Sequence, residues 1–161
     1  MTTIAANREC MSADTRVSIE TGQHYPATKI FRIGESLFGT AGHAMMCLVM
    51  IEWLKTPQRN RDRLYKQWSE ENYYREECWL LELNPRGLFL WDGWGLPEKI
   101  LSDHMAIGSG AKAALAAMAV GAEPEKAVKV AAGIDIYTHP PIQTEYLLPP
   151  ELLKPKRKRA S

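Results

Sequence analysis

Short apolar runs separated by turn-forming residues dominate the first forty positions and predict β-strands. Residues 2–6 and 10–13 flank a polar Asn-Arg-Glu segment, a pattern typical of a hairpin that begins at the start of the chain. Residues 29–33 alternate polar and apolar side chains with the period of two expected for a half-buried strand. Residues 36–40 are expected to form a further strand that ends in a glycine-containing segment.

The pattern changes to a helical one after His43. Residues 44–54 are apolar on nearly every side, which predicts a helix buried between a sheet and a second layer. Pro57 marks its end. Residues 58–77 are highly charged and carry four interleaved aromatics, namely Tyr65, Trp68, Tyr73 and Tyr74. They predict an exposed helix whose aromatic stripe either packs onto the domain or contacts another subunit.

The second half of the chain predicts a hairpin, two helices and a last strand. Residues 78–83 and 87–91 flank an Asn-Pro-Arg-Gly turn. Ser109 is expected to cap an alanine-rich helix that ends before Gly121, and Pro124 suits the first turn of a helix reaching residue 132. A turn at 138–141 precedes a strand at 143–147. This order favours an α+β protein over alternating βαβ units.

One domain is predicted over residues 1–148, with a flexible basic tail at 149–161. The 161 residues are enough to bury a core without metals or disulfides. The tail contains the run Lys-Arg-Lys-Arg at 156–159. Such a run is usually solvated, although basic runs also bind nucleic acid or acidic partners.

Composition narrows the function classes only a little. Apolar residues make up 45% of the chain and charged residues 24%, with a formal net charge of +1, so no overall charge favours nucleic acid. The three cysteines and four histidines are scattered without zinc or disulfide spacing, which favours a reducing cytoplasm. We expect no signal peptide and no membrane association, because the most apolar stretch is too short to span a bilayer.

Four motif blocks resemble one family of hydrolases. They are Thr-Thr-Ile-Ala at 2–5 with Ala-Asp-Thr-Arg at 13–16 and Lys-Ile-Phe-Arg-Ile at 29–33; Gly-Thr-Ala-Gly at 39–42; Ala-Ile-Gly-Ser-Gly at 106–110; and Asp-Ile-Tyr-Thr at 135–138. Together, in this order, they resemble proteasome β-subunits and the HslV peptidase of bacteria. The third block departs from the Ser-Gly-Gly common in the family, because Ala111 follows Gly110. Residues 58–77 have no clear match.

The resemblance implies a fold, a nucleophile and a set of catalytic residues. The fold would be a four-layer αββα sandwich of the N-terminal-nucleophile hydrolase type. The nucleophile would be Thr2 after removal of Met1, and the chain would be a threonine-type endopeptidase subunit. The implied catalytic set is Thr2, Asp14, Lys29, Gly42, Ser109, Asp135 and Thr138.

Physical chemistry is consistent with these implied roles. A threonine hydroxyl needs a base, and a free N-terminal threonine carries one in its α-amino group, with a pKa near 8. The charge of Lys29 would favour the neutral amine and a partly ionised hydroxyl, while Asp14 would hold Lys29 in place. The amide of Gly42 would face the developing oxyanion. The polar side chains of Ser109, Asp135 and Thr138 would orient the amino group.

The same resemblance implies a substrate pocket and an ion site. The pocket for the side chain before the cleaved bond would be lined by Val17, Ala27, Phe31, Thr40, Ala44 and Leu48. Its small Ala44 suggests room for a medium or large apolar side chain. HslV-like proteins can hold a monovalent or divalent cation through backbone carbonyls, and Ala132, Asp135 and Thr138 stand at those positions. No cofactor is required for peptide hydrolysis.

The implied partners are other copies of the chain, which would form a homo-oligomeric double ring, polypeptide substrates, and an AAA+ unfoldase ATPase. Two other functions remain open. The chain could be a catalytically inactive scaffold or binding subunit of the same fold, or a nucleic-acid-associated protein acting through its tail, which is the least favoured.

The motif residues also have structural interpretations: Asp14 in a turn and ion pair, Lys29 as a solvated strand residue, and Asp135 with Thr138 as helix caps.

Overall fold

The computed structural model describes residues 2–19, 21–70 and 78–149. Its first sheet has the order β10 (His104–Gly108), β1 (Thr3–Asn7), β2 (Cys10–Asp14) and β11 (Ile142–Tyr146), with every neighbouring pair antiparallel. The predicted first hairpin is confirmed. The Asn7 side chain closes its turn by accepting hydrogen bonds from the N–H groups of Glu9 and Cys10.

The second sheet contains five antiparallel strands. They are, in order, β5 (Ile30–Ile33), β6 (Ser36–Gly42), β7 (Cys78–Asn84), β8 (Gly87–Asp92) and β9 (Pro97–Ile100). The hairpin predicted around residues 84–87 is confirmed as β7–β8. A separate pair, β3 (Arg16–Ser18) with β4 (His24–Pro26), was not predicted, and neither were β9 and β10.

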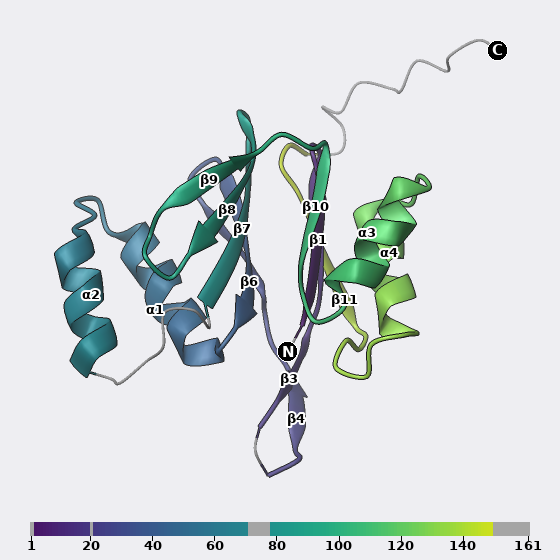
Figure 1. Cartoon of the computed structure of the whole chain (residues 1–161), viewed down its shortest axis with the longest axis horizontal. Helices are drawn as coiled ribbons and strands as arrows, with labels where there is room; N and C mark the ends of the chain where they lie inside the picture. The colour runs from purple at the N-terminus through teal and green to yellow at the C-terminus, as the bar shows by residue number, and fades with distance from the viewer. Residues whose placement is uncertain (1, 20, 71–77, 150–161) are drawn as a thin grey trace.

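Helices flank the two sheets on opposite sides (Figure 1). The helix α1 (Ala44–Lys55) packs on β6 and β7, and α2 (Arg61–Glu70) packs on α1. On the other side, α3 (Ala111–Ala119) and α4 (Pro124–Ala132) cover β1, β2 and β10. Helices and antiparallel sheets in one chain confirm the predicted α+β class.

The two sheets bury a shared apolar cluster. Side chains from both contribute to it, including Ile4, Met11, Leu37, Leu81, Leu83 and Ile107. Gly39 permits this close packing, because a Cβ atom there would collide with Ile4 and Met11. The sheets therefore hold the N-terminal end of β1 and the loop before β5 in fixed positions.

The helices agree with the predictions except at one cap. Trp68 of α2 is 1% exposed and Tyr65 packs partly against the same core, so this part of the aromatic stripe packs onto the domain. Tyr73 and Tyr74 lie outside the described residues. The predicted Ser109 cap is wrong: α3 begins at Ala111, and its N-cap is Gly110 without a side-chain hydrogen bond. The Ser109 hydroxyl is used elsewhere.

Within the described ranges, no helix has both the length and the hydropathy needed to cross a membrane.

Candidate functional site

The site forms where the start of β1 meets the end of β2. In the antiparallel β1–β2 hairpin Ile4 faces Ala13, so Thr3 comes next to Asp14 and Thr2 lies one residue further, within hydrogen-bond reach of the Asp14 side chain. Lys29 directly precedes β5 of the other sheet and reaches the same point. Residues far apart in the sequence thus meet between the sheets, because the core positions both strand ends.

Thr2, Lys29 and Asp14 form a closed set of hydrogen bonds. The Thr2 hydroxyl donates to Asp14 Oδ1 at 2.5 Å and accepts from Lys29 Nζ at 2.6 Å. Lys29 Nζ also donates to Asp14 Oδ2 at 3.0 Å and to the Arg16 carbonyl at 2.6 Å. The three residues are 4%, 6% and 0% exposed for Thr2, Lys29 and Asp14. Lys29 is therefore not a solvated strand residue.

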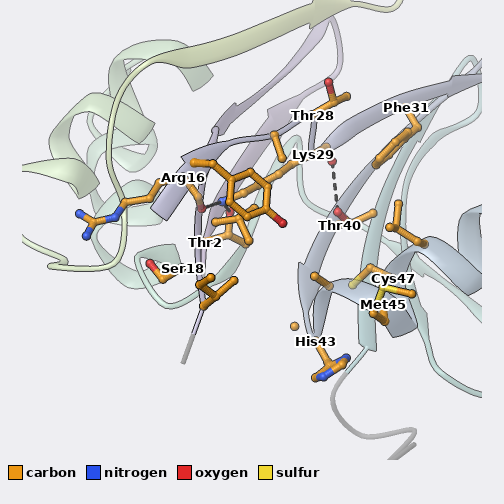
Figure 2. A pocket seen from close by; sticks show the side chains of 17 residues that line it. Thr2, Arg16, Ser18, Thr28, Lys29, Phe31, Thr40, His43, Met45 and Cys47 are labelled. Carbon is orange, nitrogen blue, oxygen red and sulfur yellow. Dashed lines mark hydrogen bonds between the residues drawn. The ribbon is translucent and has the colours of Figure 1, made fainter. Parts of the chain in front are cut away.

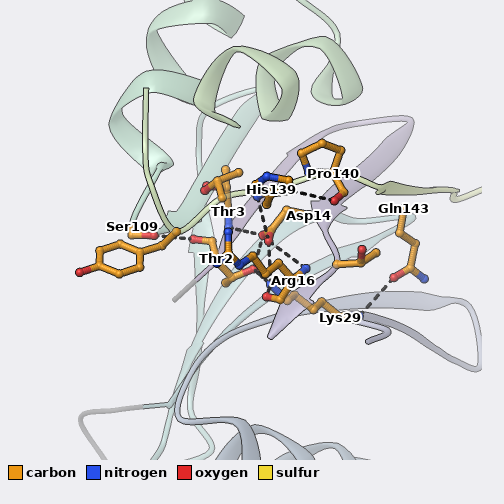
Figure 3. A network of polar contacts seen from close by, with 12 residues as sticks. Thr2, Thr3, Asp14, Arg16, Lys29, Ser109, His139, Pro140 and Gln143 are labelled. Carbon is orange, nitrogen blue, oxygen red and sulfur yellow. Dashed lines mark hydrogen bonds and ion pairs between the residues drawn. The ribbon is translucent and has the colours of Figure 1, made fainter. Parts of the chain in front are cut away.

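Backbone N–H groups complete the surroundings of the Asp14 carboxylate (Figure 3). The N–H of Thr3 donates to Oδ1 at 2.8 Å, and that of Arg16 donates to Oδ2 at 3.2 Å. The N–H of His139 lies 3.5 Å from the same Oδ2. A fully buried carboxylate needs such partners, and here they also fix its orientation toward Thr2 and Lys29.

The ammonium group of Lys29 lies in a buried environment that disfavours its charged form. Burial lowers the pKa of Lys29 below its usual value, although the charge of Asp14 and their hydrogen bond oppose that shift. The net direction is downward. The structure thus places a buried cation, balanced by a single carboxylate among the described residues, in direct contact with the Thr2 hydroxyl.

A second polar group adjoins Thr2 from the α3–α4 side. The Ser109 hydroxyl lies 2.6 Å from Asp135 Oδ2 and 3.3 Å from the Thr2 carbonyl oxygen. Its single proton can go to only one of them at a time. The Thr138 hydroxyl donates to Asp135 Oδ2 at 2.6 Å and therefore accepts from the Thr3 hydroxyl at 2.5 Å. This group is tied to both of the first two threonines.

The Asp135 carboxylate is stabilised in its ionised form. Partial burial raises its pKa, but hydrogen bonds from Ser109 and Thr138 and from the Tyr137 N–H lower it, and the net pKa lies below the usual value. Asp135 thus bonds to Ser109, and Thr138 bonds to Thr3, both of which are distant in the sequence. Capping alone does not account for these contacts.

Gly42, the remaining residue of the predicted catalytic set, lies apart from these hydrogen bonds. It ends β6 with a φ of 119° and precedes α1, and it lines the same cavity as Thr2. A positive φ of this kind favours glycine. The structure therefore joins six of the seven predicted catalytic residues directly and places the seventh across the cavity.

A cavity of about 560 Å³ opens beside Thr2. All six residues predicted to line a substrate pocket line it: Val17, Ala27, Phe31, Thr40, Ala44 and Leu48. Figure 2 shows Thr2, Arg16 and Ser18 on one side of the space and Thr40, Met45 and Cys47 on the other. The unpredicted β3–β4 pair supplies part of the wall, including Val17, Ser18 and Tyr25.

Apolar side chains are concentrated where the cavity meets solvent. Ile19, Tyr25, Met45 and Leu48 all line it, and each is between 43% and 52% exposed. An exposed apolar group gathered around one concavity is typical of a binding site rather than of ordinary surface. The arrangement provides an apolar recess directly beside a threonine hydroxyl.

The predicted ion site stays a prediction. Ala132 ends α4, and the Asp135 carbonyl in the following turn accepts a hydrogen bond from the Thr138 N–H at 3.1 Å. Across the described ranges, no group of three or more His, Cys, Asp or Glu side chains could hold a metal ion. That finding concerns side chains and does not test a site built from carbonyls.

Some contacts at the site gave no signal in the sequence. The direct hydrogen bond from Thr2 to Asp14 is one, and the Thr3–Thr138 pair is another. A third is the approach of Cys47 and Cys78, which are 31 residues apart and whose Sγ atoms lie 4.0 Å apart. Two of the three cysteines, although distant in the sequence, therefore lie close together in the fold.

Comparisons with known proteins bear on the fold. No protein-family model matches the chain, and no curated protein matches it. Among solved structures, BPH of Thiobacillus denitrificans is 24% identical with a TM-score of 0.67, covering 92% of this chain and 98% of its own. The same protein in complex with epoxomicin gives 22% identity and a TM-score of 0.65, over 92% and 99%.

A third solved structure comes from a different lineage. The HslV of Trypanosoma brucei is 22% identical with a TM-score of 0.67, covering 89% of this chain and 98% of its own. Likeness at these identities establishes the fold. The resemblance to HslV-type proteins inferred from the motif blocks is confirmed at that level.

Proposed function

We propose that this chain is a threonine-type endopeptidase subunit, with Thr2 as its nucleophile after removal of Met1. One observation carries the proposal: the Thr2 hydroxyl lies between Lys29 Nζ at 2.6 Å and Asp14 Oδ1 at 2.5 Å, beside an apolar cavity. A purely structural scaffold has no need of a buried lysine against a threonine hydroxyl, because burying that charge costs free energy.

The proposed reaction begins with proton transfer within one residue. Once Met1 is removed, the α-amino group of Thr2 accepts the hydroxyl proton while Oγ1 attacks the substrate carbonyl carbon. The positive charge of Lys29 favours both the neutral amine and the developing alkoxide. The amine then protonates the departing amine of the substrate, leaving an acyl ester on Thr2. Water activated by the same amine hydrolyses that ester and restores the hydroxyl.

Gly42 and the cavity account for the other requirements of the reaction. The Gly42 N–H would donate to the oxyanion that forms on the attacked carbonyl. The cavity would hold the side chain before the cleaved bond, and its lining by Val17, Ala27, Phe31 and Leu48 suits a medium or large apolar group. The Ser109–Asp135–Thr138 group would hold the backbone of Thr2 and Thr3 so that the amine faces Oγ1.

The architecture and assembly follow from the same proposal. We interpret the layers as the four-layer αββα sandwich of the N-terminal-nucleophile hydrolases, which agrees with the order of helices and sheets in Figure 1. We further propose a homo-oligomeric double ring that hides the nucleophile and works with an AAA+ unfoldase. A reducing cytoplasm is the proposed location, which fits the absence of a disulfide at Cys10, Cys47 and Cys78.

Peptide hydrolysis by three proteins tests the proposal. Wild type should cleave fluorogenic peptides with an apolar residue before the leaving group, and Thr2→Ala should lower kcat by roughly 10³-fold or more. The matched variant Thr2→Ser keeps a hydroxyl and should retain measurable activity. Equal activity in wild type and Thr2→Ala would overturn the assignment of Thr2, and none in assembled wild type would favour the inactive scaffold.

A further inference from the structure

Cys47 and Cys78 form a buried pair of thiols beside the cavity. Cys47 lies in the first turn of α1, and Cys78 is the first residue of β7. The Cys78 thiol lies within hydrogen-bond distance of Cys47, with the two Sγ atoms 4.0 Å apart. They are 4% and 0% exposed, respectively. Both belong to the same core cluster and neither takes part in the chemistry proposed for Thr2.

The two thiols differ in access and in acidity. Cys47 lines the cavity, so a small molecule that enters it meets Cys47 first. The hydrogen bond from Cys78 lowers the pKa of Cys47, whereas that same bond, together with burial, raises the pKa of Cys78. The accessible thiol is therefore the better nucleophile of the pair. This asymmetry is the one needed for an attacking and a resolving cysteine.

We propose that Cys47 and Cys78 are a redox modification site, at which a low-molecular-weight disulfide entering the cavity oxidises the pair to an intramolecular disulfide. The Cys47 thiolate attacks one sulfur of the small disulfide, forming a mixed disulfide and releasing one thiol. Cys78 then attacks Cys47 Sγ, and a second thiol leaves. Two cysteine thiols are oxidised and one small disulfide is reduced to two thiols, so electrons and protons balance.

The disulfide would change the geometry next to Gly42. A sulfur–sulfur bond is about 2.05 Å long, so the two Sγ atoms must approach by about 2 Å. Cys47 would also lose its hydrogen bond to the Ala41 carbonyl, now at 3.5 Å. Gly42 pairs with Cys78 across strands β6 and β7, and it lies five residues before Cys47 in the chain. A disulfide would therefore join the two segments to which Gly42 is connected. Oxidation would therefore displace the end of β6 and the start of α1.

The consequence for activity rests on the proposed function. Displacing the Gly42 amide and the cavity wall by about 1 Å should lower kcat by roughly tenfold to a hundredfold. Reduction with dithiothreitol should restore it. The formation of the disulfide itself does not depend on that function, so it is measured separately.

The experiment treats the full-length protein with oxidised glutathione, then blocks remaining thiols with iodoacetamide and maps peptides without reduction. The expected product links the peptides containing Cys47 and Cys78, with Cys10 alkylated. Cys78→Ala should instead stop at a glutathione adduct on Cys47, whereas Cys10→Ala, the matched control, should form the disulfide as wild type does. Peptide hydrolysis is followed in parallel for all three proteins.

Each outcome decides the matter. A Cys47–Cys78 link in folded protein, with reversible loss of activity absent from Cys78→Ala, supports the proposal. All three cysteines alkylated after oxidation would overturn it even if wild type hydrolyses peptides. A link that leaves peptide hydrolysis unchanged would overturn the effect on the site. A link in a protein that never hydrolyses peptides would support the redox pair while contradicting the peptidase.

Discussion

At the residue scale, the site depends on one buried cation between a hydroxyl and a carboxylate. Lys29 loses most of its hydration, and Asp14 is the group among the described residues whose charge compensates that loss. Because Asp14 also accepts three backbone N–H groups, its position does not depend on Lys29 alone. The arrangement is closed by hydrogen bonds and electrically balanced, as the role proposed for Thr2 requires.

Replacing Lys29 by alanine tests that balance. The change removes the charge beside Thr2 and leaves Asp14 buried without its cation, so we expect kcat/KM to fall by roughly 10²-fold to 10⁴-fold. The free energy of unfolding should fall by about 3 kcal/mol. Lys126→Ala, in the exposed part of α4, is the control and should change neither. Activity of Lys29→Ala within a few-fold of wild type would remove Lys29 from the mechanism.

The lowered pKa of Asp135 leads us to expect a specific dependence of thermal stability on pH. Its pKa in the folded protein lies below the ordinary value of 3.8, so its stabilising contacts are fully present above that pH and are lost as pH falls through the folded pKa. Asp135→Asn should therefore lower Tm at neutral pH, and the difference from wild type should shrink below pH 3.8. Thermal melting between neutral and strongly acidic pH measures this.

An exposed carboxylate provides the comparison for Asp135. Asp103 is 89% exposed at its side chain and pairs with Arg8 at 3.3 Å, so Asp103→Asn should change Tm little at any pH. A Tm difference for Asp135→Asn that is constant across the whole pH range would show that its carboxylate is not held by Ser109 and Thr138 as described.

At the element scale, the sequence predicted the longer strands and helices, which have a clear hydrophobic period or turn and cap residues. It did not predict the short strands. The hairpins β1–β2 and β7–β8 and the helices α1 and α4 carry alternation, turn residues or caps that local physics explains. The strands β3 and β4 have three residues each, and β4 and β9 contain proline, which argues against a strand when read locally. They form because tertiary pairing supplies what local preference does not.

Ser109 illustrates the same limit at a single cap. A serine before an alanine-rich run is a good local signal for a helix N-cap. In the fold its hydroxyl lies against Asp135 and the Thr2 carbonyl instead, and α3 begins two residues later. Contacts with residues distant in sequence outweighed the local preference for capping. The motif resemblance, which grouped Ser109 with Asp135, therefore predicted the surroundings of its hydroxyl better than the capping rule did.

The close approach of the two sheets at Gly39 gives a prediction for β6. A Cβ atom at this position would collide with Ile4 and Met11, so Gly39→Ala should lower the free energy of unfolding by about 1–3 kcal/mol. Gly133→Ala is the control, because a Cβ there meets only the Val130 carbonyl at an ordinary 3.5 Å. Denaturant unfolding compares the two, and equal stabilities would contradict the described packing of the sheets.

At the scale of the whole molecule, the motif blocks predicted more than periodicity could. Periodicity gave an α+β protein, whereas the order of the blocks indicated an HslV-like fold, which the solved structures support. The resemblance implied that Lys29 lies beside Thr2 and is held by Asp14, but neither approach could give the distances, which arise only when both sheets are assembled. The basic tail at 150–161 lies outside the described residues, so its role stays a prediction.

Self-association is the prediction that belongs to this scale. The proposed peptidase activity, at an open cavity with an apolar opening, would need to be enclosed, so we expect the purified protein to form a homo-oligomeric ring at micromolar concentration. Light scattering coupled to size-exclusion chromatography measures the mass. A monomer under those conditions would contradict the ring, although it would leave the assignment of Thr2 untouched.

The central claim is that Thr2 becomes a free N-terminal nucleophile, and intact mass spectrometry with a covalent trap tests it most directly. Wild type and Thr2→Ala are weighed before and after incubation with epoxomicin or a peptide boronate. We predict that wild type lacks Met1 and gains one adduct, located on Thr2, and that Thr2→Ala gains none. A wild-type chain that keeps Met1, or an assembled Met-free chain that stays unlabelled, would contradict the claim.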